Sequence, residues 1–163
     1  MKKITLAGGC FWGVQAYFNR VIGVTKTQTG YIDGRTKNPS YQDVLNGSGH
    51  AEALYIEYDA AKTDLKTLLD HYFNIIDPTV LNRQGNDVGL SYRTGIYTYD
   101  NQDILYVNQY IKEIQNQYKK PIVTDVKEAK DFYPAERYHQ NYLDKNPGGY
   151  CHINLRDINK IQK

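Results

Sequence analysis

A cysteine at position 10 is the first residue of this chain whose type and setting could carry out chemistry. It lies in the hexapeptide GGCFWG (residues 8–13), is one of only two cysteines, and comes directly before two aromatic residues, the second of which is the sole tryptophan. A scarce thiol after a flexible glycine pair and beside two large rings is typical of a nucleophile facing a small apolar pocket. The simpler interpretation is that Cys10 is a small buried hydrophobe.

The same segment predicts the reactivity of this thiol. An apolar stretch precedes the glycines and an amphipathic stretch follows them, so Cys10 is expected at a strand-to-helix turn. There, the N–H groups and dipole of the helix would favour the thiolate. We therefore expect the pKa of Cys10 to be lowered and the sulfur to be nucleophilic at neutral pH.

A carboxyl group at position 52 is the second candidate. Residues 51–58 alternate in polarity, which places Glu52 on one face with Leu54 and Ile56. A buried carboxyl without a cation has a raised pKa and can act as a general acid at pH 7. A slip at the start of the strand would instead leave Glu52 in solvent. His50, two residues earlier, could lie on the same face and bind a substrate.

The loop at residues 86–92 offers further polar groups. Its sequence, NDVGLSY, supplies an amide, the carboxylate of Asp87 and the phenol of Tyr92, and loops of this kind carry binding groups on a rigid frame. With 16 tyrosines in the chain, any single tyrosine is more often structural than functional.

The elements that must position these groups follow from hydrophobic periodicity. The order is strand, helix, strand, strand, helix, strand, which is typical of a split βαβ arrangement. We therefore predict an α+β fold, a two-layer sandwich with a ferredoxin-like core and a mainly antiparallel or mixed sheet. The segments are strand 2–7, helix 12–20, strand 24–32, loop 34–40, strand 51–58, helix 65–76 with Asp64 as N-cap, loop 82–91, strand 95–99 and helix 104–118.

The last quarter of the sequence has weaker signals. A short strand is expected near 122–126 and a helix over 134–143. An extended C-terminal tail begins at about residue 144, and the mostly polar residues 156–163 are expected to be loosely held.

Length and charge exclude several classes of protein. The 163 residues predict one domain, 1–163, and a formal charge of +2 without a run of like charges argues against nucleic acid or an anionic membrane as a partner. No segment reads as a signal peptide or a membrane span, so we expect a cytoplasmic chain whose cysteines are thiols or a transient pair. The absence of a surplus apolar stretch favours a monomer.

Six separate blocks of sequence occur in the order known from one enzyme family. The chain resembles peptide methionine-sulfoxide reductases of the A type over nearly its whole length, and its tail resembles the subgroup with a single resolving cysteine. The blocks are GCFWG at 9–13, the run from GY at 30–31 to NPSY at 38–41, GHAEA at 49–53, RQGND at 83–87, YR at 92–93 and NPGGYC at 146–151.

The resemblance implies a role for each candidate residue. In the family, the residue matching Cys10 attacks the sulfur of methionine S-sulfoxide, free or peptide-bound, and the residue matching Glu52 protonates its oxygen. The residues matching Tyr41 and Tyr92 hydrogen-bond that oxygen. The rings matching Phe11 and Trp12 hold the S-methyl group, and the residue matching Asp87 helps to arrange the site.

The resemblance also implies how the enzyme is recycled. Loss of the oxygen leaves Cys10 as a sulfenic acid, which condenses with the residue matching the resolving cysteine, Cys151. No cofactor or metal is expected; thioredoxin or another dithiol would reduce the Cys10–Cys151 disulfide. The alternative interpretation of this pair is a permanent disulfide that closes a long loop.

Two other functions are compatible with the residues. The first is a cysteine hydrolase or acyltransferase, with Cys10 as nucleophile and His50 or His139 as base. The second is a metal-binding module built from Cys10, Cys151, His152 and another histidine, whose ligands lack compact zinc spacing.

Overall fold

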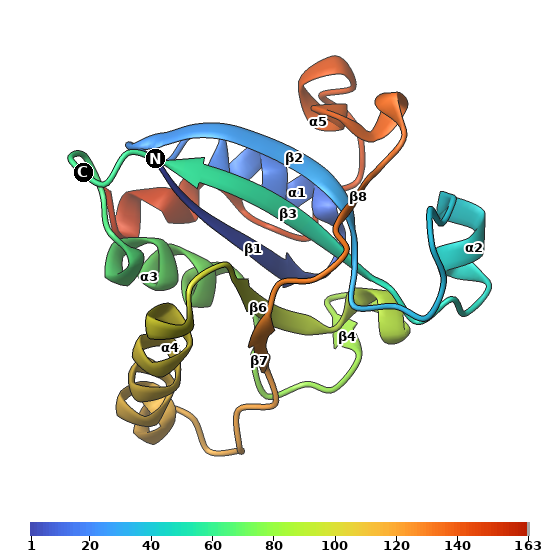
Figure 1. Ribbon diagram of the computed structural model, residues 1–163. Helices are drawn as coiled ribbons and strands as arrows, with labels where there is room; N and C mark the ends of the chain where they lie inside the picture. Colours follow the sequence, from blue (N-terminus) through green and yellow to red (C-terminus); the bar gives the residue numbers. More distant parts are fainter. Residues whose placement is uncertain (163) are drawn as a thin grey trace.

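The computed structural model describes residues 1–162 and is organised around one mixed sheet (Figure 1). The six strands are ordered β7-β6-β1-β3-β2-β8. The β1/β3, β3/β2 and β1/β6 pairs are antiparallel, whereas β6/β7 is parallel. The strands span β1 Lys2–Gly8, β2 Val24–Ile32, β3 Ala51–Tyr58, β6 Thr94–Thr98, β7 Asp125–Glu128 and β8 Tyr133–Pro134.

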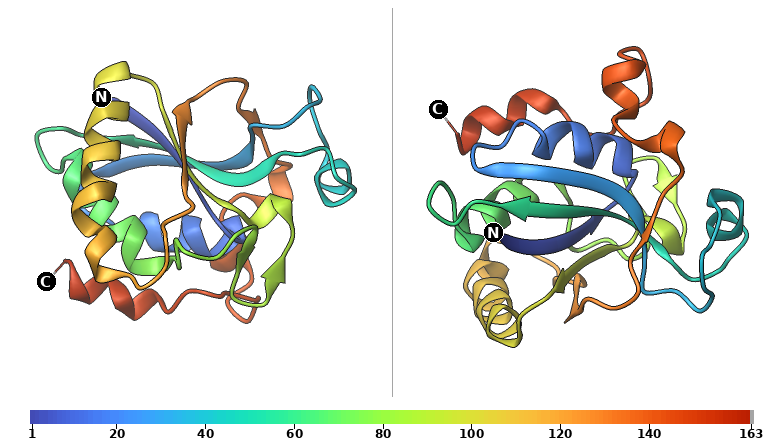
Figure 2. Two further views of the ribbon diagram at one scale, coloured as in Figure 1. Left: turned by 90° about the horizontal axis from the view of Figure 1, so that it is seen from below. Right: turned by 45° about the horizontal axis from the view of Figure 1, so that its top comes forward.

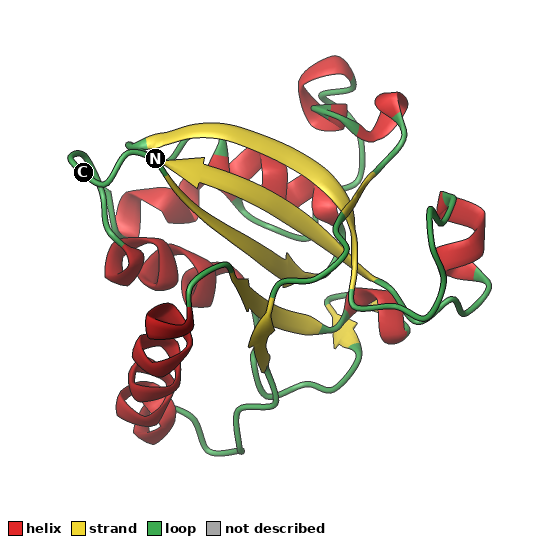
Figure 3. Ribbon diagram, viewed as in Figure 1, coloured by secondary structure: helices red, strands yellow, loops and turns green. Residues whose placement is uncertain are grey.

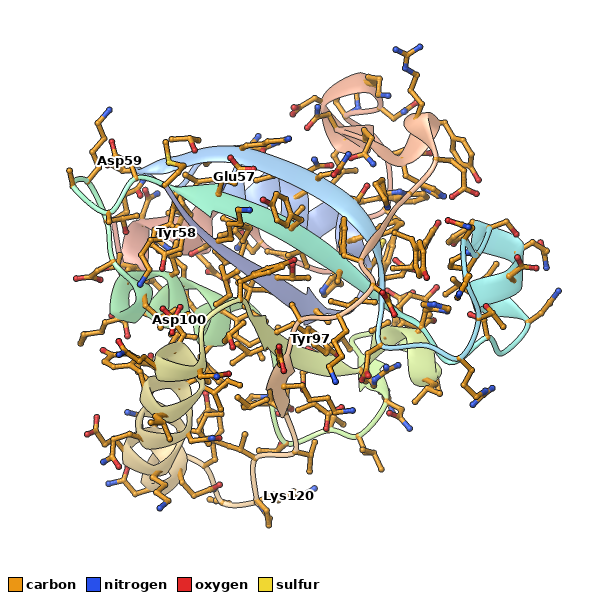
Figure 4. All side chains as sticks on the ribbon, viewed as in Figure 1. Glu57, Tyr58, Asp59, Tyr97, Asp100 and Lys120 are labelled. Atoms are coloured by element: carbon orange, nitrogen blue, oxygen red, sulfur yellow. The ribbon has the colours of Figure 1, made fainter. Side chains whose placement is uncertain are left out.

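Helices α1 (Phe11–Phe18) and α3 (Leu65–Ile75) cover one face of this sheet, and α4 (Asn101–Ile114) lies beside the edge formed by β6 and β7 (Figure 3). The side chain of Asp64 accepts a hydrogen bond from Thr67 N at 2.8 Å and begins α3 as predicted. Asp100, labelled in Figure 4, caps α4 in the same way.

The remaining elements are short. Within residues 1–162, two helices, three 3₁₀ turns and one hairpin lie in the connections, and a fourth 3₁₀ segment is the last element. They are α2 Tyr41–Leu45, α5 Tyr142–Lys145, η1 Leu90–Tyr92, η2 Gln115–Gln117, η3 Arg137–His139, η4 Leu155–Lys160, and β4 Arg83–Gln84 with β5 Asp87–Val88.

The main core lies between the sheet and the helices α1 and α3. On β3, Leu54 and Ile56 are fully buried there, whereas Ala51 and Ala53 face the other side of the sheet. That alternation follows from the two-residue period of a strand. It places Glu52 on the helix side, where 1% of its surface is exposed.

The helix predicted over 134–143 is wrong. Its residues form β8, the turn η3 and, after a break at Asn141, the beginning of α5. Asn141 adopts a left-handed conformation with φ of 54°, and its N–H donates to Gln15 Oε1 at 2.7 Å. The side chain of Gln140 bonds to both backbone groups of Thr29. These long-range bonds replace the hydrogen bonds of a continuous helix.

The expectation that residues 156–163 are loosely held is also wrong for the residues described; Lys163 lies outside them. The segment forms η4, which packs against α1 and α3 on the helix side of the sheet (Figure 2). Ile158 is 8% exposed, and Asn74 Nδ2 donates to Asp157 O at 2.7 Å. A few apolar residues in a polar sequence are enough to close this end of the core.

Two smaller predictions are corrected. The strand expected near 122–126 lies at Asp125–Glu128, and the loop predicted over 82–91 contains the β4/β5 hairpin and the start of η1. Within residues 1–162, no helix combines the length and the apolar character needed to cross a bilayer.

Candidate active site

Cys10 stands between the end of β1 and the start of α1. Gly9, just before it, has a φ of 85°, and a Cβ there would lie 2.7 Å from Gln84 Cβ, so the turn requires glycine. Cys10 is the N-cap residue of α1 but makes no side-chain cap, and 7% of its surface is exposed. The predicted strand-to-helix turn is confirmed.

The prediction of a lowered Cys10 pKa is wrong. Burial raises the pKa of this thiol, and the negative charges of Glu52 and Asp87 raise it further. The backbone of Trp12, in the first turn of α1, lowers the pKa by a smaller amount. Burial, the largest cause, outweighs the helix N-terminus, so the thiol is protonated at neutral pH.

Glu52 approaches the same turn from β3. Its Oε1 accepts a hydrogen bond from Phe11 N at 3.2 Å, while its Oε2 is buried and has no hydrogen-bond partner among residues 1–162. Burial raises the pKa of Glu52 to about 8, the charge of Asp87 adding to the effect. The carboxyl is therefore mostly protonated at pH 7, and Oε2 is the oxygen free to carry the proton.

Two phenols come to this point from separate segments. Tyr41 begins α2 and Tyr92 ends η1; both are half-buried, and each affects the pKa of the other, so the two phenols face the same place. Burial raises the pKa of Tyr41 to about 12 and that of Tyr92 further, and the charge of Glu52 is the next cause in both. Both phenols keep their protons at pH 7 and can donate hydrogen bonds.

An aromatic wall lies beside the cysteine. Phe11 is 1% exposed, and the half-buried indole of Trp12 stacks on Tyr142 with ring centroids 3.8 Å apart. Trp12 Nε1 donates to His139 Nδ1 at 3.0 Å, which fixes the ring in its plane. The His139 ring also lies 4.5 Å from that of Tyr41. The wall is apolar and polarisable, as a thioether methyl group requires.

Asp87 reaches the site from the β4/β5 hairpin. Its Oδ2 is buried without a hydrogen-bond partner among the described residues, and its charge raises the pKa of both Cys10 and Glu52. The C-terminal segment approaches the same hairpin, because burial and then the charge of Asp87 raise the pKa of Tyr150. Tyr150 was not predicted as a site residue; its only signal in the sequence is its place directly before Cys151.

The second cysteine lies against α1. Cys151 Sγ donates to Ile153 O at 3.1 Å, and a Cβ on Gly13 would be 3.0 Å from this sulfur. Cys151 lies on Gly13 and its neighbour His152 on Gly8, so the C-terminal segment passes the Cys10 turn although 141 positions separate the two cysteines. Both are free thiols in this structure.

His50 is not brought into this cluster. Its ring packs on Gly34, bonds to Ser48 Oγ at 2.8 Å, and bonds to the backbone of Thr36. The ring lines a cavity together with Ile32 and Tyr97, which belong to the cluster on the other side of the sheet, so it does not share the face of Glu52. The structure therefore places His50 apart from Glu52 and Cys10, and a role for His50 in binding substrate stays a prediction.

The two alternative functions gain no support from the histidines. Neither His50 nor His139 is among the groups that perturb the pKa of Cys10. His139 is 1% exposed, and burial lowers its pKa, so it is a neutral ring that supports Trp12. Across residues 1–162, no group of three or more Cys, His, Asp or Glu side chains is arranged to hold a metal ion.

Comparisons with known proteins agree with one another. The family model described as "Peptide methionine sulfoxide reductase" matches residues 2–163. A relative from Clostridium tetani, named peptide methionine sulfoxide reductase MsrA, is 58% identical over 156 residues, 95% of each chain. Mxr1 from Saccharomyces cerevisiae in reduced form has a TM-score of 0.88 at 36% identity, covering 94% of this chain and 91% of that one. Mxr1 in complex with Trx2 has a TM-score of 0.63 at 25% identity, covering 86% and 84%.

Proposed function

The chain belongs to the peptide methionine sulfoxide reductase family and is a thiol-dependent reductase of methionine S-sulfoxide that thioredoxin recycles; from this premise we propose which residues perform each step. Cys10 is the nucleophile, Glu52 the acid, Tyr41 and Tyr92 the hydrogen-bond donors, and Cys151 the resolving thiol. Phe11, Trp12 and Asp87 complete the site.

The substrate binds with its sulfur at Cys10. Its S-methyl group rests on the wall of Phe11 and Trp12, and its oxygen points to Glu52 Oε2 and the two phenols. This orientation explains why the buried Oε2 of Glu52 has no hydrogen-bond partner among residues 1–162: its partner is the substrate oxygen. It also accounts for the selection of one epimer. In the other epimer the methyl group and the oxygen exchange places, so the oxygen would face the aromatic wall.

The first step transfers oxygen to Cys10. The sulfur of Cys10 attacks the sulfoxide sulfur, Glu52 donates its proton to the oxygen, and the phenols stabilise the charge that develops there. As the oxygen takes the Glu52 proton, the Cys10 thiol gives its own proton back to Glu52. The hydroxyl then passes from the substrate sulfur to the Cys10 sulfur: the substrate S–O bond and the transient bond between the two sulfurs break, methionine leaves with the electron pair, and Cys10 becomes a sulfenic acid. The raised pKa of Cys10 supports a mechanism in which the thiol loses its proton only as the sulfoxide oxygen gains one.

The second step forms the disulfide. Cys151 condenses with the Cys10 sulfenic acid and releases water, and a dithiol then returns both cysteines to thiols. The structure of Mxr1 in complex with Trx2 supports a thioredoxin in this role. We propose that thioredoxin reduces the Cys10–Cys151 bond directly, without a further relay cysteine, since Cys10 and Cys151 are the only cysteines of the sequence.

The finer description of the fold belongs to this proposal. The order β6-β1-β3-β2 with antiparallel pairs, covered on one face by α1 and α3, supports a split βαβ core. The C-terminal segment from about residue 144 adds Cys151 to it, so we treat 1–163 as one catalytic domain. A monomeric state, a cytoplasmic location and the use of both free and peptide-bound sulfoxide stay predictions.

One observation carries the proposal: Glu52, buried and protonated at pH 7, faces a buried thiol. Methionine formation is measured from each resolved epimer, with dithiothreitol and then with thioredoxin, for the parent, Cys10→Ser and Cys151→Ser. We expect turnover of the S epimer alone, no activity in Cys10→Ser, and loss of thioredoxin-dependent turnover in Cys151→Ser. Turnover of neither epimer by the parent would refute the proposal.

A further inference from the structure

Three consecutive residues of the C-terminal segment surround Cys10. The hydroxyl of Tyr150 lies by Gly85 in the β4/β5 hairpin, where an added Cβ would be 3.8 Å from it; Cys151 Sγ lies on Gly13 of α1, and His152 Nε2 is 3.1 Å from Gly8 O at the end of β1. The segment therefore contacts the chain on both sides of Cys10: at Gly8, two residues before it, and at Gly13, three residues after it.

The contact of His152 is specific to one ring nitrogen. Gly8 O can only accept, so Nε2 carries the proton and donates the hydrogen bond. The ring lies over the turn: a Cβ on Gly9 would be 3.0 Å from His152 Nε2, and one on Gly85 would be 3.3 Å from His152 Cβ. Two glycines thus leave the space that the histidine fills.

The contact of Cys151 depends on a third glycine. Gly13 is in the interior of α1, where alanine would be the better helix former. A Cβ at this position would lie 3.0 Å from Cys151 Sγ and 3.2 Å from Ile153 Cδ1, so the tail would have to move by a few tenths of an ångström. Glycine here leaves room for the sulfur.

We propose that Gly13 and His152 are positioning residues that hold the Cys151 thiol beside Cys10 before the sulfoxide reacts. The inference rests on the proposed roles of the two cysteines and deepens them. Cys151 attacks the sulfur of the Cys10 sulfenic acid; the S–S bond forms, the S–O bond breaks, and the leaving oxygen takes the Cys151 proton to give water. Because the thiol is already in place, this step needs no refolding of the tail.

The test separates the two steps in a single turnover. Reduced enzyme is mixed with the S epimer without any reductant but with a 1,3-dione that traps sulfenic acid, and methionine, disulfide and trapped Cys10 are quantified over time. The variants are Gly13→Ala, His152→Leu and His152→Gln, which retains an amide donor at a similar reach. Gly148→Ala is the control, because a Cβ at this exposed glycine would meet no atom within 4 Å.

We expect Gly13→Ala and His152→Leu to form methionine at the parent's rate but the disulfide about tenfold more slowly, the effect of losing one buried hydrogen bond or close packing contact. Trapped sulfenic acid should rise correspondingly. His152→Gln should recover most of the disulfide rate, and Gly148→Ala should match the parent.

The readout is the ratio of disulfide to trapped Cys10, counted only over enzyme that has formed methionine. Unfolded enzyme forms no methionine, so a partly unfolded sample does not change this ratio. Parental ratios in both Gly13→Ala and His152→Leu would overturn the inference while leaving the proposed function intact. Failure of the parent to form methionine would instead refute the proposed function itself.

Discussion

Replacing Glu52 with glutamine tests the proposed acid directly. Glutamine has the same shape, and its Oε1 can still accept the hydrogen bond from Phe11 N that the structure shows at 3.2 Å. The substitution therefore removes the transferable proton and leaves the turn before α1 intact. The other groups around the thiol are unchanged.

The size of the effect follows from the protonation state of Glu52. With a pKa of about 8, the carboxyl is about nine-tenths protonated at pH 7, since each pH unit is a tenfold change. General acid catalysis of this kind contributes about 10²–10⁴-fold to a rate. We expect Glu52→Gln to lower the rate of methionine formation at pH 7 by a factor in that range.

The pH profile discriminates this mechanism from a structural role. In the parent, the rate should fall as the pH rises through about 8 and Glu52 loses its proton. In Glu52→Gln this fall should vanish, and the rate should increase steadily with pH as more Cys10 becomes thiolate. The assay is single-turnover methionine formation by rapid quench between pH 5 and 10. A variant with parental rate at pH 7, or with an unchanged alkaline fall, would refute the reasoning.

Three further predictions concern the same cluster. Because the folded state keeps the Glu52 proton between pH 4.5 and about 8 while the unfolded chain releases it, stability is lost as the pH rises through that window. In the parent, the free energy of unfolding measured with urea should fall by about 4–5 kcal/mol across that window, at 1.36 kcal/mol per pH unit, and Glu52→Gln should remove this fall. An equally steep fall in the parent and the variant would contradict the prediction. Tyr41→Phe and Tyr92→Phe should each slow methionine formation by about tenfold or more, and the double variant by less than the product because both phenols donate to the same substrate oxygen; a strictly multiplicative double variant would show that the two phenols act independently. Since burial and the Glu52 charge raise the Cys10 pKa, alkylation of Cys10 by iodoacetamide, followed by mass spectrometry, should be slow at pH 7 and accelerate with pH; rapid, pH-independent labelling would indicate a thiolate.

Local patterns were sufficient for the central part of the fold. The two-residue period of 51–58 predicted that Glu52 is buried, and it is 1% exposed. The strand, glycine pair and amphipathic stretch around Cys10 predicted the turn, because backbone conformation there is set by neighbouring residues. Asp64 was predicted to cap α3 for the same reason.

Interactions between distant segments were not predictable in this way. His139 was considered only as a base, yet it accepts the indole N–H of Trp12, 127 positions away. The predicted helix at 134–143 is broken by bonds to residues near 15 and 29. In both cases the partner is remote in sequence, so no local period indicates it.

The sequence by itself determined the family, the reactive thiol, the buried acid and the strands and helices that carry them, because these depend on residue type and short-range periodicity. Only the tertiary structure decided the pKa of Cys10 and the approach of the C-terminal segment to the active site. Burial beside Glu52 and Asp87, rather than the helix N-terminus, sets the pKa of Cys10. Likewise, packing of the tail on Gly13 and Gly8 brings Cys151 to the site. The pKa of Cys10 and the position of Cys151 both depend on contacts between residues far apart in the sequence, which exist only once the chain has folded.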